Sequence, residues 1–144
     1  MKAQVLIVDG HSIIFQWPEL AAQHAANRLA ARESLVHALT RLQDSSDWHV
    51  AVVFDGKSPR STEASQPGGI QVFYSASGRT ADSVIERLVA KYGRQFEVTV
   101  ATDDHMERTT VQSFGARAIS SLQLRDELDR AGARLNEHLS RLRR

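Results

Sequence analysis

The feature that most constrains this chain is a series of short apolar segments separated by stretches with helical periodicity. Residues 5–8, 50–54 and 98–101 are short and rich in β-branched residues, residues 70–74 alternate in polarity, and residues 116–119 form a weaker fifth segment. Short apolar runs of this kind suit strands buried on both faces of a sheet. Strands that alternate with helices predict a parallel sheet, so we expect an α/β fold with about five strands flanked by helices.

The stretches between these segments carry apolar residues at helical spacing. This spacing predicts helices over residues 27–44, after Thr80, over residues 106–114 and over residues 121–144. Residues 56–69 are instead rich in Gly, Pro and Ser, which predicts a long loop rather than a crossover helix. Loops of this length in compact domains are usually functional or mobile, so we expect a mobile loop near the path of a substrate.

Length, charge and composition exclude several classes of protein. The 144 residues predict one domain, and the absence of cysteine excludes disulfides, thiolate zinc sites, iron–sulfur clusters and cysteine nucleophiles. The net charge of +1 does not indicate nucleic acid, and 6% aromatic residues supply a base-stacking platform poorly. No apolar run approaches the roughly 20 residues of a membrane span, and the first residues do not resemble a secretory signal. We therefore expect no membrane partner and a cytoplasmic location.

Aspartates follow the predicted strands at the point where each strand ends. Asp9 and Asp55 close the first two strands, Asp82 lies in the first turn of the helix after the third, and Asp103 and Asp104 follow the fourth. Each acid also has a local explanation, since Asp-Gly pairs form turns and acids stabilise helix N-termini. Because ligands of parallel α/β sheets bind beyond the carboxyl ends of the strands, we expect these carboxylates to converge.

Converging carboxylates repel one another and favour a bound cation. Oxygen ligands without cysteine or paired histidine suit Mg²⁺ or Mn²⁺, and the sequence does not decide between the two ions. Such an ion activates water and offsets phosphate charge, which suits phosphodiester hydrolysis. The predicted metal-site residues are Asp9, Asp55, Asp82, Asp103 and Asp104.

Several blocks of the chain resemble a known family in order and in spacing. Residues 5–14, followed by Trp17-Pro18-Glu19-Leu20, are similar to the opening of the YacP-like NYN domains, and residues 53–56, 80–86 and 100–104 resemble the later blocks of that family. The resemblance covers about residues 3 to 130. It implies a PIN-like nuclease fold with strand order 3-2-1-4-5 and a metal-dependent endoribonuclease activity. It also implies RNA as the partner and, for some members, the ribosome, with roles in mRNA decay or ribosome-associated RNA processing.

The resemblance also implies which residues form the site. Carried over by motif, the metal-site acids are Asp9, Asp82 and Asp104, with Asp55 as a further member. Ser12 stands where the family usually has Asn, and a serine hydroxyl can do part of the work of that amide over a shorter reach. We therefore place Ser12 with the catalytic residues. Asp103 stands where the family more often has Ser or Asn, and it either strengthens metal binding or caps a helix.

Three basic residues and a histidine flank the predicted site. Lys57, Arg60 and Arg79 lie on loops at the same edge, and His11 follows Asp9 closely, so these four residues are candidates for RNA binding. Solvated loops explain the three basic residues equally well, and a histidine beside acids is more often a surface or packing residue.

Two alternatives remain at this stage. The first is a catalytically weak or inactive RNA- or ribosome-binding module with the same fold, which Ser12 would favour. The second is a phospho-receiver domain, which usually carries an acidic pair after the first strand and a lysine after the fifth. This chain has Gly10-His11 and Ser120-Ser121 at those places, so we rank the receiver far lower.

Overall fold

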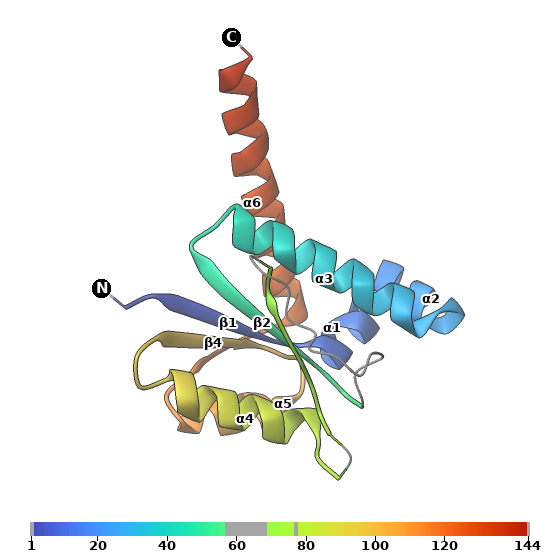
Figure 1. Ribbon diagram of the computed structural model, residues 1–144, viewed down its shortest axis with the longest axis vertical. Coiled ribbons are helices and arrows are strands. Elements are labelled where there is room, and N and C mark those ends of the chain that lie inside the picture. Colours follow the sequence, from blue (N-terminus) through green and yellow to red (C-terminus); the bar gives the residue numbers. More distant parts are fainter. Residues whose placement is uncertain (1, 57–68, 77, 144) are drawn as a thin grey trace.

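The computed structural model describes residues 2–56, 69–76 and 78–143 and contains a five-stranded sheet (Figure 1). All neighbouring strands pair in parallel, in the order β3-β2-β1-β4-β5. Both the α/β class and the strand order implied by the resemblance are confirmed. The strands are β1 (Gln4–Asp9), β2 (Trp48–Phe54), β3 (Gln71–Tyr74), β4 (Glu97–Ala101) and β5 (Arg117–Ile119).

The position of β1 decides against the phospho-receiver alternative. Receiver domains have the flavodoxin-like order 2-1-3-4-5, in which the first strand lies between the second and the third. Here β1 lies between β2 and β4, with Ile7 opposite Ala51 on one side and Val100 on the other. The strand order therefore excludes the receiver fold.

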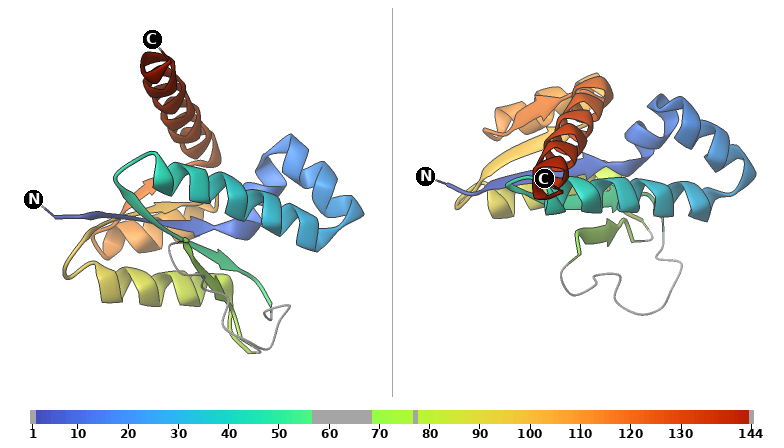
Figure 2. Two further views of the ribbon diagram at one scale, coloured as in Figure 1. Left: turned by 45° about the horizontal axis from the view of Figure 1, so that its top comes forward. Right: turned by 90° about the horizontal axis from the view of Figure 1, so that it is seen from above.

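Helices cover both faces of the sheet, because neighbouring residues of each strand point to opposite sides (Figures 1 and 2). In β1, Leu6 and Val8 pack on one helical layer, while Val5 and Ile7 pack on the other. The first layer contains α1 (Gly10–Gln16), α2 (Pro18–Ala26), α3 (Arg28–Asp44) and α6 (Ser121–Leu142), and the second contains α4 (Ala81–Tyr92) and α5 (His105–Ser113).

Helices α1 and α2 are the elements that the sequence pattern did not predict. Asp9 ends β1 and accepts a hydrogen bond from the Ser12 amide, so it caps α1 instead of forming a turn with Gly10. Trp17 ends α1, and Pro18 begins α2 at the first helical position, where its missing N–H costs nothing. Two such short helices present too few apolar turns for a clear stripe.

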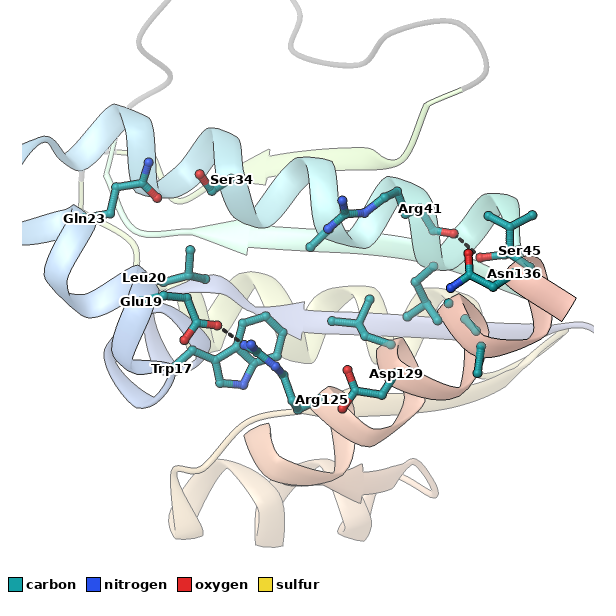
Figure 3. Close-up of a pocket in the computed structure, with 17 residues that line it drawn as sticks. Trp17, Glu19, Leu20, Gln23, Ser34, Arg41, Ser45, Arg125, Asp129 and Asn136 are labelled. Carbon is teal, nitrogen blue, oxygen red and sulfur yellow. Dashed lines mark hydrogen bonds and ion pairs between the residues drawn. The ribbon is translucent and has the colours of Figure 1, made fainter. Parts of the chain in front are cut away.

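The Trp-Pro-Glu-Leu block fastens these helices to the C-terminal helix. The Trp17 side chain is buried, and its Nε1–H donates to the Ser121 carbonyl over 3.1 Å. The Arg125 guanidinium lies 4.7 Å from the centre of the Trp17 ring and pairs with Glu19 (Figure 3). These contacts form one end of a groove between α2, α3 and α6, which is lined further along by Leu42 and Leu135. None of the predicted site acids lines this groove.

The buried residues of helix α6 all lie in its first half. Leu124 and Ala131 are buried, whereas Leu135, Leu139 and Leu142 are exposed. Figure 1 shows the second half of this helix protruding beyond the sheet and its covering helices. The predicted helix over residues 121–144 is thus present as Ser121–Leu142.

Some expectations fall on residues 57–68, which lie outside the described part of the chain. They are the mobility of the predicted loop and the RNA contacts of Lys57 and Arg60. In the described ranges, no helix is both long and apolar enough to cross a membrane.

Gly10 lies in a crowded place and Gly132 in an open one, so replacing each by alanine should change stability in opposite directions. A Cβ at Gly10 would lie 2.5 Å from the buried Phe54 ring, so Gly10→Ala should lower the free energy of unfolding by about 1–3 kcal/mol. A Cβ at Gly132 in α6 meets nothing within 4 Å, so Gly132→Ala should raise that free energy by about 0.5–1 kcal/mol. Urea denaturation of both variants checks the pair, and equal effects would contradict the tight contact at Gly10.

Candidate active site

The centre of the site is Asp9, at the carboxyl end of the central strand. Its side chain is only 6% exposed. The Thr102 hydroxyl, just after β4, donates to Asp9 Oδ2 over 2.9 Å, and the Ser12 amide donates to Oδ1 over 3.4 Å. Burial raises the pKa of Asp9, and the hydrogen bonds from Thr102 and Ser12 oppose that rise. The charge of Asp82 raises this pKa further, so the two carboxylates are electrostatic neighbours.

Glu107 is a second buried acid at the same edge. It lies in the first turn of α5 and is 2% exposed, and its Oε1 has no hydrogen-bond partner among the described residues. Burial raises the pKa of Glu107 to about 9, together with the hydrogen bond and charge of Asp82 and the charge of Glu86. This shift favours the protonated form of Glu107 at neutral pH.

Asp82 and Glu86 complete a group of acids that we call the acidic cluster: Asp9, Asp82, Glu86 and Glu107. Asp82 and Glu86 are one turn apart on α4, so they lie on the same face of that helix. Both act on Glu107 of α5, and Asp82 also acts on Asp9 of β1. The structure thus brings together acids from a strand and two helices, including two of the predicted metal-site residues.

Asp104 is connected to this cluster through Thr102. The Asp104 amide donates to Thr102 Oγ1 over 3.2 Å, and the same hydroxyl donates to Asp9. Asp104 Oδ1 accepts from the amides of Met106 and Glu107, so it caps α5. The spacing of Asp104 and Glu107 suggests a reciprocal capping box, but the Asp104 amide is taken by Thr102 and the Glu107 carboxyl interacts with α4.

Asp103 and Asp55 lie at the same edge and bind other helix starts. The Asp103 carboxylate accepts from the Ser121 amide over 2.8 Å and from the Ser121 hydroxyl over 2.6 Å, which ties the end of β4 to α6. Asp55 Oδ1 accepts from the Ala81 amide over 3.0 Å, which ties the end of β2 to α4. Each of these two acids therefore has a structural role in the protein without metal.

Ser12 joins the first helix to the segment after β4. Its hydroxyl oxygen accepts a hydrogen bond from the Asp103 amide over 2.8 Å. Because its own amide donates to Asp9, Ser12 contacts two of the predicted metal-site acids.

The described candidates for RNA contact lie on exposed surface. His11 is exposed in the first turn of α1, and its charge lowers the pKa of Asp9. Arg79 is exposed between β3 and α4, immediately before the Thr80 cap.

The sequence interpretation missed Glu86, Thr102 and Glu107. A signal for Glu107 was present, because the residue one turn later on α5 is Val111, which is fully buried and marks the inward face of that helix. Glu86 similarly follows Asp82 by one turn. The role of Thr102 has no comparable signal, since it depends on the pairing of β1 with β4.

The chemical type of the possible ligand atoms fits a hard divalent ion. Every candidate ligand in the acidic cluster is a carboxylate oxygen, which suits Mg²⁺ or Mn²⁺. The orphaned Glu107 oxygen and the raised pKa values of Asp9 and Glu107 indicate that ionising these buried carboxyls is costly without a cation. In the described part of the chain, no three acidic or histidine side chains already stand in a metal-holding arrangement.

The buried Glu107 predicts a pH dependence of stability. The folded protein keeps this proton up to about pH 9, while the unfolded chain loses it near pH 4.5. The folded state therefore binds more protons in this window, and the free energy of unfolding should fall as pH rises, by at most about 1.4 kcal/mol per pH unit. Glu107→Gln stays neutral and should flatten the profile and raise stability at pH 8.

Urea denaturation in EDTA at pH 5 to 9 measures this profile. Glu33→Gln, an exposed substitution on α3, is the matched control and should keep the wild-type slope. A slope in Glu107→Gln as steep as that of the wild type would contradict the assignment.

Comparison with known proteins places the chain in a family. The chain is 27% identical over 140 residues to the Bacillus subtilis (strain 168) protein YacP, an alignment that covers 96% of this chain and 82% of that protein. The crystal structure of Rae1 (YacP) from Bacillus subtilis superposes with a TM-score of 0.80 and that of its W164L mutant with 0.82, both at 27% identity and over 96% of this chain. The alignments cover 80% and 82% of those two chains.

The family model described as the YacP-like NYN domain matches residues 6–144, which include every strand of the sheet except the first residues of β1. The matched region contains the whole acidic cluster and the Trp-Pro-Glu-Leu block. The chain belongs to the YacP-like NYN domain family.

Proposed function

We propose that this protein is a metal-dependent endoribonuclease that hydrolyses RNA phosphodiester bonds at the acidic cluster. The observation that carries the proposal is the meeting of Asp9, Asp82, Glu86 and Glu107 at the carboxyl edge of the sheet. Membership in the family, which is part of the PIN-like nuclease superfamily, indicates a nuclease-like role connected with RNA. We propose a cytoplasmic role in mRNA decay or in RNA processing at the ribosome.

The residues that would hold Mg²⁺ or Mn²⁺ are Asp9, Asp82 and Asp104, with Glu107 beside them. A bound ion supplies activation of water and neutralisation of phosphate charge. Asp55 and Asp103 support this set by fixing the starts of α4 and α6.

The other residues of the site position these acids and the substrate. Thr102 links Asp9 to the Asp104 backbone, and Ser12 links Asp9 to the Asp103 backbone. Arg79 and His11, together with Lys57 and Arg60, supply cationic or polar groups that can bind RNA phosphates.

Cleavage assays with acid-to-amide variants test the proposal. Labelled single-stranded and structured RNA is incubated with Mn²⁺, Mg²⁺ or EDTA. The wild type should cleave only with a divalent ion, and Asp9→Asn or Asp82→Asn should lower the rate at least about 100-fold, as expected when a group that stabilises the transition state is removed. Asp44→Asn, at the exposed end of α3, is the control and should cleave like the wild type.

RNA that is bound but never cleaved, whatever the ion, would instead support the alternative of a binding module with the same fold. Isothermal titration with Mn²⁺ separates the metal site from the reaction. Unchanged Mn²⁺ affinity in both Asn variants would remove the proposed metal site.

Ser12 provides a second test. Ser12→Ala removes the acceptor of the Asp103 amide and should lower turnover by roughly tenfold, because the acids after β4 lose a positioning contact. Ser12→Asn keeps a polar side chain whose oxygen can accept the same hydrogen bond, so it should keep or raise turnover. Mn²⁺ affinity and turnover of both variants are measured together. Metal-dependent cleavage that is indifferent to both substitutions would show that Ser12 has no positioning role.

A further inference from the structure

Three side-chain rings form a row on the surface beside the acidic cluster. The His11 and Phe15 ring centres are 4.5 Å apart, and those of Phe15 and His24 are 4.7 Å apart. His11 and Phe15 are one turn apart on α1, and His24 belongs to α2. We call these three residues the ring row.

The ring row is not part of the hydrophobic core. Helix α1 is anchored by Ile13 and Ile14, which are 0% and 3% exposed, whereas Phe15 is 47% exposed. The interplanar angles of 49° and 62° show that the two histidines contact Phe15 obliquely instead of covering it face to face. These contacts hold the Phe15 side chain in place while leaving almost half of it open to solvent.

The ring row begins next to Asp9, the central acid of the candidate active site. Helix α1 starts directly after Asp9, which caps it, and the His11 charge acts on the Asp9 carboxyl. Phe15 lies one turn further along, about 6 Å from His11 along the helix axis. A nucleotide whose phosphate lies at the acidic cluster can therefore place its own base, or the next one, on the ring row.

We propose that His11, Phe15 and His24 form a stacking site for an unpaired base of the RNA, adjacent to the phosphate bound at the acidic cluster. This inference rests on the proposed function. An aromatic face accepts any base, since every base has a π-face, so the site favours single-stranded over double-stranded RNA without a strict sequence preference. The low aromatic content suggested that such a platform is poorly supplied. The count of Phe, Trp and Tyr leaves out histidine, and a platform needs only a few rings in one place.

Binding measurements with matched phenylalanine variants test the stacking site. The probe is a fluorescein-labelled single-stranded RNA of eight nucleotides, titrated in EDTA so that no metal-dependent cleavage occurs. Phe15→Leu keeps the size and apolar character of the side chain but removes its π-face, and it should weaken binding about 5- to 100-fold. Phe15→Tyr keeps the ring and should bind like the wild type. Phe114→Leu, at a phenylalanine that is 56% exposed and caps the end of α5, is the control and should also bind like the wild type.

An abasic probe tests whether the bases are what Phe15 binds. Removing all eight bases from the RNA should abolish the difference between wild type and Phe15→Leu, and both proteins should bind a blunt RNA duplex equally. If wild type and Phe15→Leu bind single-stranded RNA equally while the wild type cleaves it, the stacking site is wrong and the nuclease proposal stands. If the wild type neither binds nor cleaves RNA, both proposals are overturned.

Discussion

The hydrogen bond from Thr102 to Asp9 joins the ends of the two strands on which the candidate active site is built. Because β1 and β4 pair in parallel with Val8 opposite Ala101, the residues that follow them emerge side by side. The same threonine hydroxyl accepts the Asp104 amide, so one buried contact sets the relative position of two acids that are far apart in the sequence. The burial that makes this contact strong also makes the ionised form of Asp9 costly.

The acids at this edge serve the fold and the proposed chemistry at once. Asp9, Asp55, Asp103 and Asp104 each accept a hydrogen bond from an amide in the first turn of a different helix. Helix N-termini carry partial positive charge, which offsets some of the repulsion among the carboxylates. Local capping and a shared cation site are therefore compatible explanations of the same residues. Glu107 lacks such compensation for one of its oxygens among the described residues, and its burial raises its pKa and so favours the protonated carboxyl.

Helix α1 has one buried face and one exposed face near the site. Helix α1 buries Ile13 and Ile14 against the sheet and presents His11 and Phe15 to solvent beside Asp9. The Trp-Pro-Glu-Leu block then turns the chain into α2 and fixes it to α6 through Trp17. Contacts of Trp17 with α6 on one side thus support an exposed row of rings on the other, and a binding surface that is held in place before binding loses less conformational entropy.

The sequence by itself determined the strands, the long helices and the edge at which the aspartates collect, because these follow from local periodicity and from the rule that parallel strands end together. It could not decide which acids face one another. Asp9, Asp55 and Asp103 look equivalent along the chain and each binds a helix start, yet only Asp9 among them also interacts with Asp82 in the acidic cluster. Glu107, which looks like part of a cap, is buried against α4. Only the tertiary structure decided this, since the direction of a side chain at a helix start depends on which amides and carboxylates the neighbouring elements bring within reach.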